Sequence, residues 1–307
     1  MPCRELFVDC DDHQLACLAH ENPEASDPPI VWVHGLTMSV RFWEKGMFES
    51  VVAHRSWYSV SLPLHHPSTF SRPLTAETLN EGLFAEMLRV AIDALVPETE
   101  AKRMVHLVGH SLGGFAALNY AAKHPDRVAS VVSIGGFMTG RARGLEGALQ
   151  FLSKERFGRK ALFHLAYRIL RSHYLFLKIA GVSYGRRFRT LLRSETVEAT
   201  LRHVYPDVCR HPVDAQRAFC AFLLDMDLFD EIDQIHQPVL FIVGDRDPII
   251  SPVHQVECAR RLPQGELRLY QKVGHLAFAE APDQFERDLV EWLERHDGAA
   301  AESAPSS

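Results

Sequence analysis

The strongest constraint on this fold is a series of short apolar runs that alternate with segments of helical periodicity along much of the chain. The first clear run is Ile30–Val33, and similar runs recur at residues 57–62, 104–109, 128–134, 238–244 and 266–273. Short runs rich in β-branched residues are typical of parallel strands that are covered by helices on both faces. The alternation therefore predicts an α/β fold with a mostly parallel sheet flanked by helices.

Further patterns complete the expected sheet and its helices. Alternating residues at 5–10 and 14–19, joined by Asp11-Asp12, predict an N-terminal β-hairpin and bring the sheet to about eight strands. Helical spacing is found at residues 75–95, 112–123 and 253–262. The closing helix has one apolar face, formed by Phe285, Leu289, Trp292 and Leu293. Residues 298–307 after it are expected to form a disordered tail.

One long interval breaks this alternation. Residues 137–235 have helical periodicity and no convincing strand. We therefore expect a helical cap at 137–235, inserted into an α/β core that consists of residues 1–136 and 236–297. The apolar side of residues 162–177 could line an acyl pocket under this cap. The alternative is an ordinary packed helix with solvated arginines on its outer side.

The cap is also the basic part of the chain. Residues 137–193 contain thirteen basic and two acidic residues, a local charge of +11, whereas the rest of the chain carries 20 basic and 37 acidic residues. The overall charge of −6 argues against a general nucleic-acid binder, which is normally basic. A strongly basic cap could instead make transient contact with an anionic carrier or membrane surface.

The cysteines and the N-terminus bear on the cellular compartment. The six cysteines are scattered without a C-x-x-C pair, so we expect reduced thiols and no zinc site (Cys3, Cys10, Cys17, Cys209, Cys220 and Cys258). The N-terminal residues lack the apolar stretch of a secretory signal. The most apolar long segment, residues 161–180, is interrupted by three cations, which disfavours a membrane span. A cytoplasmic location is expected.

A short glycine-rich segment predicts a nucleophile. Gly109-His110-Ser111-Leu112-Gly113 follows an apolar strand and begins a helix, so it matches G-x-S-x-G in a strand–turn–helix setting. A sharp turn there strains Ser111 and exposes its hydroxyl, and a side chain at Gly109 or Gly113 would collide with neighbouring backbone. The following helix directs N–H groups toward a developing oxyanion. The alternative is a glycine-rich loop used only for packing.

A serine hydroxyl needs a base and a group that orients the base. His275 is the best candidate base, because it follows the last predicted strand and lies beside Gly274. The acid is expected after the strand at 238–244, where the sequence offers Asp245 and Asp247. We favour Asp247, since the flanking Gly244 and Pro248 shape a turn that can project it toward the histidine. Asp245 is the alternative.

An oxyanion hole requires backbone donors from two loops. The Leu112 N–H follows the nucleophile, and the Leu36 N–H lies in the loop after the strand Ile30–Val33. Gly35 allows that loop to turn, and we expect His34 to be a buried residue that fixes the loop rather than a catalytic one. His110 is counted with the glycines as a supporting residue of the serine turn.

Together these motifs resemble those of the α/β-hydrolase fold superfamily, over about residues 5 to 295. The residues that carry the resemblance are Val33-His34-Gly35, the segment 109–114, the segment 124–128, the segment 244–248 and Gly274-His275. The resemblance implies a serine hydrolase with a helical cap over its pocket, in which Ser111 is the nucleophile, Asp247 the acid and His275 the base. Leu36 and Leu112 would supply the oxyanion hole.

The chain departs from that family at residues 61–68. Many members carry Asp-x-x-Gly-x-Gly-x-Ser at this place, whereas this chain has Ser-Leu-Pro-Leu-His-His-Pro-Ser. The missing glycines imply a differently shaped loop near the pocket mouth. His65 and His66 could contact substrate there, although paired surface histidines are more often inert.

A serine at the turn favours acyl chemistry over the related dehalogenases and epoxide hydrolases, which use an aspartate there. We expect hydrolysis of a small carboxylic ester or thioester of an apolar acyl group, through an acyl-enzyme on Ser111. No metal or organic cofactor is required. Acyl transfer, a lyase reaction or C–C bond hydrolysis on the same scaffold are alternatives, as is a non-catalytic ligand binder. The sequence leaves the oligomeric state open.

Overall fold

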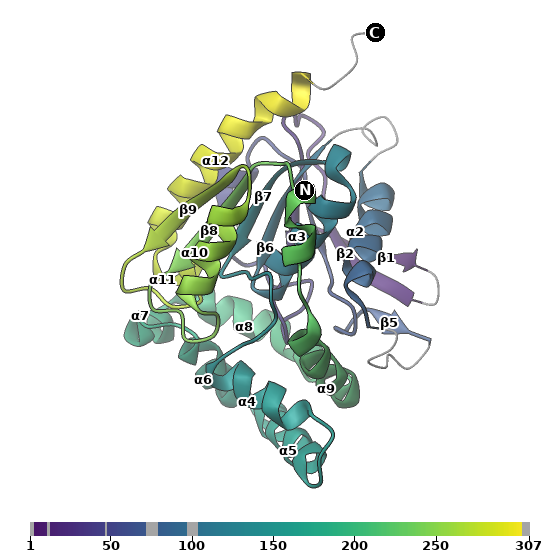
Figure 1. The fold of residues 1–307 in the computed structure, drawn as a ribbon, viewed down its shortest axis with the longest axis vertical. Helices are drawn as coiled ribbons and strands as arrows, with labels where there is room; N and C mark the ends of the chain where they lie inside the picture. Colours follow the sequence, from purple (N-terminus) through teal and green to yellow (C-terminus); the bar gives the residue numbers. More distant parts are fainter. Residues whose placement is uncertain (1–2, 11–12, 47, 72–78, 97–103, 303–307) are drawn as a thin grey trace.

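A computed structural model describes residues 3–10, 13–46, 48–71, 79–96 and 104–302. Within these residues the central sheet has nine strands in the order β1-β2-β4-β3-β6-β7-β8-β9, and β5 pairs with β2 (Figure 1). The strands are β1 (Arg4–Cys10), β2 (His13–His20), β3 (Ile30–Val33), β4 (Trp57–Val60), β5 (Thr69–Phe70), β6 (Val105–His110), β7 (Val128–Ile134), β8 (Val239–Gly244) and β9 (Gly265–Tyr270).

The sheet is mostly parallel, as the sequence predicts. Strands β4, β3, β6, β7, β8 and β9 pair in parallel, whereas β2 is antiparallel to β1 and β4. The predicted N-terminal hairpin strands pair with each other, and the predicted turn Asp11-Asp12 lies outside the described residues. The strand that the sequence did not predict is β5, which consists of two residues and is too short to show a period.

Twelve helices and three 3₁₀ segments are found in the described parts of the chain. The helices are α1 (Glu49–Val52), α2 (Glu81–Leu95), α3 (Leu112–Lys123), α4 (Gly144–Ser153), α5 (Arg159–Ser172), α6 (Tyr174–Ser183), α7 (Phe188–Arg193), α8 (Glu195–Val208), α9 (Val213–Phe222), α10 (Pro252–Arg261), α11 (Ala277–Glu280) and α12 (Pro282–Glu302). The 3₁₀ segments are η2 (Pro125–Arg127), η3 (Leu223–Asp225) and η4 (Phe229–Gln234).

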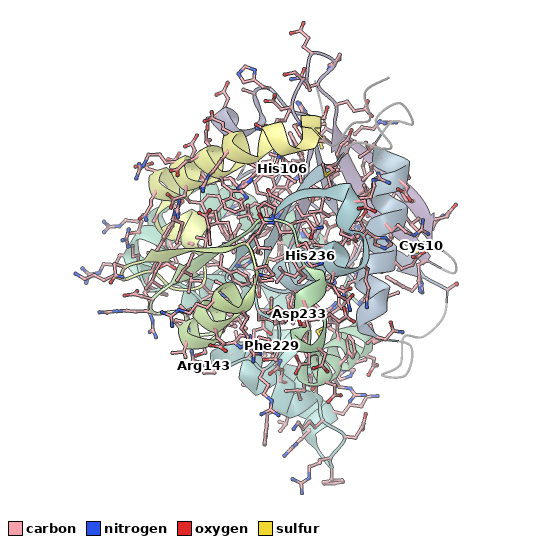
Figure 2. All side chains as sticks on the ribbon, turned by 45° about the horizontal axis from the view of Figure 1, so that its top comes forward. Cys10, His106, Arg143, Phe229, Asp233 and His236 are labelled. Atoms are coloured by element: carbon pink, nitrogen blue, oxygen red, sulfur yellow. The ribbon has the colours of Figure 1, made fainter. Side chains whose placement is uncertain are left out.

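Helices cover both faces of the sheet, because successive strand residues point to opposite sides. In β8, Phe241 and Val243 join the apolar core under α2, α3 and α10. Leu240 and Ile242 join the core under α1 and α12. His106 of β6 lies next to α12 (Figure 2), where its Nε2 is 3.1 Å from a carboxylate oxygen of Asp297. The two cores hold the strands in one rigid layer.

Several element ends differ from the predictions; β4, for example, ends at Val60 rather than at residue 62, and α2 begins at Glu81. Two of the differences have a local explanation. Strand β9 ends at Tyr270 rather than at residue 273, because Lys272 adopts a left-handed conformation with φ 58° that no strand can continue. Helix α12 extends to Glu302, so residues 298–302 are helical and not part of a disordered tail. The alanines at 299–301 favour a helix, which explains the extension. Residues 303–307 lie outside the described part of the chain.

Helices α4 to α9 lie together at one end of the sheet, below it in Figure 1. We call residues 137–235, which contain them, the helical insertion. An isolated bridge between Thr139 and Asp227 joins the two ends of the insertion, and the Leu228 N–H donates to the Met138 carbonyl at 2.9 Å. The division of the chain into a core (1–136 and 236–297) and a cap (137–235) stays a prediction.

Candidate active site

Ser111 occupies a sharp turn between β6 and α3. Its backbone has φ 54° and ψ −116°, a conformation that L-residues rarely adopt. The Ser111 N–H donates to the Ile134 carbonyl at 2.8 Å, which ties the turn to β7. A Cβ added at Gly109 would lie 2.2 Å from the Gly113 carbonyl oxygen, and one at Gly113 would lie 2.3 Å from the Val33 carbonyl oxygen. Only glycine fits at both positions.

His275 and Asp247 form a buried hydrogen-bonded pair. His275 Nδ1 lies 2.7 Å from Asp247 Oδ2, and both side chains are almost fully buried. The other carboxylate oxygen, Oδ1, accepts the Ile249 and Ile250 N–H groups at 2.7 and 2.9 Å. Gln255 also donates to Oδ2, at 3.0 Å. Because the carboxylate only accepts, the His275 proton lies on Nδ1, and Nε2 is left as the basic nitrogen.

Asp245, the alternative acid, does not reach His275. Its Oδ1 accepts the Val273 N–H at 3.3 Å, and its own N–H donates to the Tyr270 carbonyl at 3.0 Å. Asp245 therefore connects the loops that follow β8 and β9. Of the two candidate carboxylates, the structure places Asp247 against the histidine.

Ser111 and His275 line the same cavity, which has a volume of about 300 Å³. Within the described chain the Ser111 side chain makes no hydrogen bond, to His275 or to any other residue, and such bonds often form only when substrate is bound. Most of the wall is apolar and comes from the loop after β3, from the helical insertion and from the loop after β9 (Leu36, Met38, Phe42, Trp43, Leu145, Leu149, Leu170, Leu177, Leu201, Leu276 and Phe278).

The predicted oxyanion donors are backbone N–H groups that the described chain leaves unused. The N–H of Thr37 donates to His65 Nε2 at 3.1 Å, and that of Met38 donates to the Gly35 carbonyl at 3.3 Å. The Leu36 N–H between them and the Leu112 N–H at the start of α3 have no acceptor among the described residues. Leu36 and Gly35 line the cavity. The Leu36 N–H therefore lies at the cavity, and Leu112 directly follows Ser111, which also lines it.

Two buried histidines hold this loop. The Leu62 N–H donates to His34 Nε2 at 3.0 Å, so the ring proton lies on Nδ1 and is donated to the Gly35 carbonyl at 2.8 Å. His65 Nε2 is the acceptor of the Thr37 N–H, and its Nδ1 donates to the Pro63 carbonyl at 2.7 Å. Both rings are neutral in this arrangement. Complete burial lowers the pKa of His34 and of His65 to about 3.

The position of His65 corrects the expectation of a surface pair. His65 is fully buried, because its ring satisfies the Thr37 N–H inside the fold. His66 is partly exposed, and its Nε2 lies 3.8 Å from Asp207 Oδ1 on α8. It does not line the cavity. His211, which sequence analysis did not single out, accepts the His66 N–H at 3.0 Å and donates to the Met38 carbonyl at 3.0 Å.

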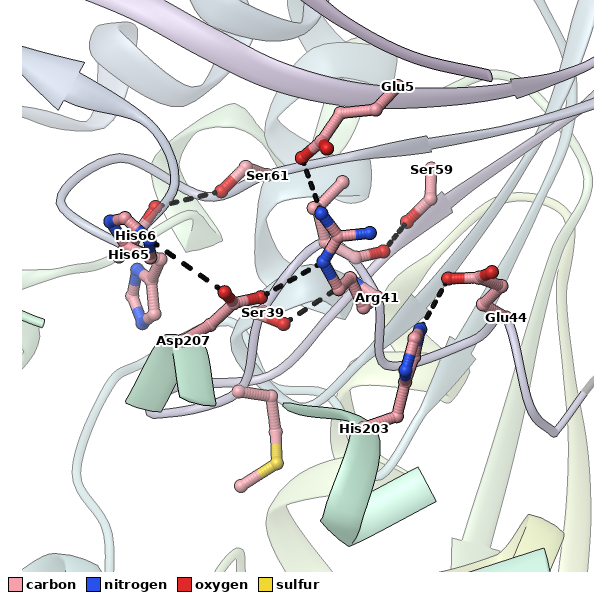
Figure 3. Close-up of polar contacts among 12 residues, drawn as sticks. Glu5, Ser39, Arg41, Glu44, Ser59, Ser61, His65, His66, His203 and Asp207 are labelled. Atoms are coloured by element: carbon pink, nitrogen blue, oxygen red, sulfur yellow. Dashed lines mark hydrogen bonds and ion pairs between the residues drawn. The ribbon is translucent and has the colours of Figure 1, made fainter. Parts of the chain in front are cut away.

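A polar network connects the far side of the same loop to α8 (Figure 3). Arg41 lies 2.7 Å from a carboxylate oxygen of Glu5 on β1 and 3.4 Å from one of Asp207. The Nε2 atom of His203, on α8, lies 2.6 Å from Glu44 Oε2. The helical insertion is thus bonded to the loop that carries the Leu36 N–H.

His110 supports the loop of His275. Its Nε2–H donates to the His275 carbonyl at 3.2 Å, and its ring stacks on Phe42 and contacts Phe278 edge-on. Burial, followed by the nearby His275, lowers the pKa of His110 well below its ordinary value. Its Nδ1 is buried and has no partner in the described chain. His110 is therefore a neutral packing residue beside the cavity.

Two buried glutamates near His275 escaped the sequence analysis. Glu280 accepts the N–H groups of Gly274, Arg186 and Arg187 at 2.7 to 2.8 Å. It therefore joins the His275 loop to the segment between α6 and α7, whose Tyr184 carbonyl also accepts the His275 N–H at 2.9 Å. No local pattern marks Glu280, because two of its three bonds come from Arg186 and Arg187, which are distant in sequence.

Glu146 of α4 lines the cavity itself. One carboxylate oxygen accepts the Tyr184 hydroxyl at 2.6 Å, and the other, Oε2, is buried without a partner in the described chain. Burial raises the pKa of Glu146. It adds to a mostly apolar wall a buried carboxylate oxygen that could bond to a ligand.

The chain matches the alpha/beta hydrolase fold family over residues 28–282, and it belongs to this family. It is 28% identical to a pimeloyl-[acyl-carrier protein] methyl ester esterase of Nitrosomonas europaea, over 87% of this chain and 96% of that protein. It is 24% identical to lipase 1 of Psychrobacter immobilis, over 86% and 76%. An esterase structure from Exiguobacterium antarcticum has the same fold, with a TM-score of 0.71 at 18% identity over 94% and 98% of the two chains.

Proposed function

We propose that this chain cleaves a carboxylic ester or thioester of an apolar acyl group through an acyl-enzyme on Ser111. The broader class, a carboxylic-ester hydrolase of the alpha/beta type, is supported by the family and by the esterases and lipase among its relatives. One observation supports the serine mechanism above all others. The His275 ring, held by Asp247 at 2.7 Å, lines the cavity that Ser111 also lines.

In the first half-reaction, the Ser111 hydroxyl oxygen attacks the carbonyl carbon and gives its proton to His275 Nε2. The carbonyl electrons move onto the oxygen, which the Leu36 and Leu112 N–H groups stabilise. A donor of this kind contributes about 3 to 4 kcal/mol of transition-state stabilisation. Collapse of the intermediate breaks the bond to the alcohol or thiol, which takes the proton from His275.

In the second half-reaction, water replaces the leaving group. His275 Nε2 takes a proton from the water as its oxygen attacks the acyl carbon, and the proton is then returned to Ser111 as the carboxylic acid departs. Asp247 keeps the ring proton on Nδ1 throughout and stabilises the imidazolium that forms in each half.

The lining of the cavity supports an apolar acyl group. Aliphatic and aromatic side chains from the helical insertion and from the core form most of the wall. A volume of about 300 Å³ suits a small or medium-sized acyl chain. An acyl group attached to a carrier is a second candidate substrate, because several relatives are named for a carrier-bound methyl ester.

The test is turnover of p-nitrophenyl esters and acyl thioesters of increasing chain length, together with mass spectrometry after exposure to an alkyl phosphonate. We expect one covalent adduct on Ser111 and no turnover in Ser111→Ala. Ser194→Ala is a matched control, because Ser194 lines the same cavity but lies at the start of α8. An adduct on another residue, or unchanged turnover in Ser111→Ala, would refute the proposal. Added alcohols or amines would reveal acyl transfer.

A further inference from the structure

Exposed apolar side chains are concentrated on the helical insertion. Among the residues that the structure describes, thirteen large apolar side chains are exposed, and ten of them lie between Leu145 and Phe188. Isolated exposed apolar residues are ordinary, but a concentration of this kind marks an interaction surface. Phe157, in the turn between α4 and α5, is as exposed as in an open chain, at 108%.

These side chains form stripes on two adjacent helices. In α5, Leu162, Leu165 and Ile169 are spaced at i, i+3 and i+7, which places them on one side of the helix. In α6, Leu175 and Ile179 are one turn apart. The two helices pack against each other. We call Phe157, Leu162, Leu165, Ile169, Leu175 and Ile179 the outer apolar face.

The packing of the insertion does not require this face. Phe163 and Tyr167 are the fully buried residues of α5, and Leu177 and Val182 are those of α6. Leu170 of α5 and Leu177 line the cavity from the inner side of the two helices. The fold therefore does not depend on burial of the outer residues. Their exposure to water is unfavourable in free energy, and a partner that covered them would remove this penalty.

Cations accompany the outer apolar face. Arg156 precedes Phe157, and Arg168 lies between Leu165 and Ile169 in sequence. Both side chains are exposed, and neither makes an ion pair within the described part of the chain. Lys154 and Arg189, on either side of this region in the chain, are likewise exposed and unpaired there. Positive charge and apolar side chains are thus presented by the same helices.

We propose that the outer apolar face docks on a bilayer that contains anionic lipids. The apolar side chains would enter the region of the acyl chains, and the arginines would contact lipid phosphates. Charge alone would fit an acidic protein equally well. Two aliphatic stripes and a protruding phenylalanine favour the bilayer, because they need an apolar medium rather than an anionic surface. None of the described helices is long and apolar enough to cross a membrane, so the contact is at the interface.

Docking in this way would place the cavity next to the lipids. Leu145 at the start of α4 is 41% exposed and also lines the cavity, so it lies where the cavity meets the surface. The inner sides of α5 and α6 form part of the cavity wall. An ester dissolved in the bilayer would therefore reach Ser111 by a short path. Binding itself is independent of the proposed reaction, because no outer residue lines the cavity.

The test is cosedimentation of the full chain with two kinds of vesicles, pure phosphatidylcholine and an equal mixture of phosphatidylcholine and phosphatidylglycerol. We expect binding to the mixed vesicles that weakens with added salt, and equal binding by Ser111→Ala. Combined replacement Phe157→Ser, Leu165→Ser and Ile169→Ser should reduce partitioning roughly tenfold or more. Arg156→Gln with Arg168→Gln should also weaken it and should reduce the salt dependence.

Matched controls come from the core. Val253→Ser with Leu269→Ser removes exposed apolar side chains, and Arg260→Gln with Lys272→Gln removes exposed cations, in both cases outside the insertion. Both control variants should bind as the wild type does, and every variant of the outer apolar face, of the cations and of the core should, if folded, hydrolyse a water-soluble ester as the wild type does; Ser111→Ala is compared for binding alone. Failure of the wild type to bind mixed vesicles would overturn the proposal. Unchanged binding by the combined variant Phe157→Ser, Leu165→Ser and Ile169→Ser would also overturn the proposal. Binding to an acidic carrier protein in place of vesicles would overturn it as well.

Discussion

Acidification should destabilise this chain through the histidines that hold the loop after β3. In His34 and in His65 one ring nitrogen accepts a backbone N–H and the other donates to a carbonyl. A second ring proton would face an N–H group and break the bond. The fold therefore keeps both rings neutral, and burial lowers each pKa from its ordinary 6.5 to about 3.

The size of the effect follows from proton binding. Between the folded and unfolded pKa values, the unfolded chain holds one more proton for each histidine, so stability falls as the pH falls. The loss is about 1.4 kcal/mol per pH unit for each ring. For His34 and His65 together, lowering the pH from about 7 to about 5 should cost about 4 kcal/mol. A typical domain has a total stability of about 5 to 15 kcal/mol.

Urea unfolding of the wild type and of His65→Asn across this pH range provides the assay. Asparagine does not titrate, so we expect the variant to be less stable near neutral pH but to lose about 1.4 kcal/mol less per pH unit on acidification. Val60→Ala, which removes part of another buried side chain nearby, is the control. It should be destabilised by a similar amount at every pH. If His65→Asn keeps the wild-type pH dependence, the reasoning is refuted.

Three further predictions concern single side chains. Asp247→Asn should lower kcat about 10⁴-fold without unfolding the chain. The asparagine oxygen must face the two backbone N–H groups, so its NH₂ would face His275 and force the ring proton onto Nε2. Steady-state kinetics and a thermal melt test this prediction. Gly113→Ala should destabilise the fold by about 1–3 kcal/mol in urea unfolding, whereas Gly181→Ala, whose added Cβ makes only ordinary contacts of 3.5 Å, should not. Glu280→Gln, which can satisfy the N–H groups with only one oxygen, should lower kcat more than it raises KM for a soluble ester.

The sheet could be predicted because burial on both faces determines the composition of its strands. The runs at Ile30–Val33 and at residues 128–134 and 238–244 are mostly apolar, with Ser130 and Ser133 as exceptions in the second, and each forms a strand that lies between two others. Strand β5 could not be predicted, because two residues show no periodicity. The end of β9 depends on the left-handed conformation of Lys272, and a lysine in the sequence does not indicate such a conformation.

The candidate site was partly predictable for a similar reason. Ser111 lies in a motif whose glycines are required by close backbone approaches, so local sequence is informative. Turn shape favoured Asp247 over Asp245, and the structure gives Asp247 the contact with His275. Their catalytic roles stay predictions until the variants are measured.

The remaining parts of the site depend on contacts between distant segments. His65 is buried because it meets Thr37, and Glu280 is buried because it meets the segment after α6. Glu146 reaches the cavity from α4, more than a hundred residues before His275. A single sequence contains no periodicity or motif that reports such pairings, and only the folded chain reveals them.

The bonds that Glu280 and Tyr184 make have a consequence for product release. The segment between α6 and α7 is joined to the His275 loop by the Glu280 carboxylate and by the Tyr184 carbonyl. The insertion cannot swing away on that side without disturbing the imidazole. Leu145 and Lys45 are exposed and also line the cavity, so they mark openings that need no movement of that segment. Exit past them would release the acid and the alcohol while the His275 ring keeps its position.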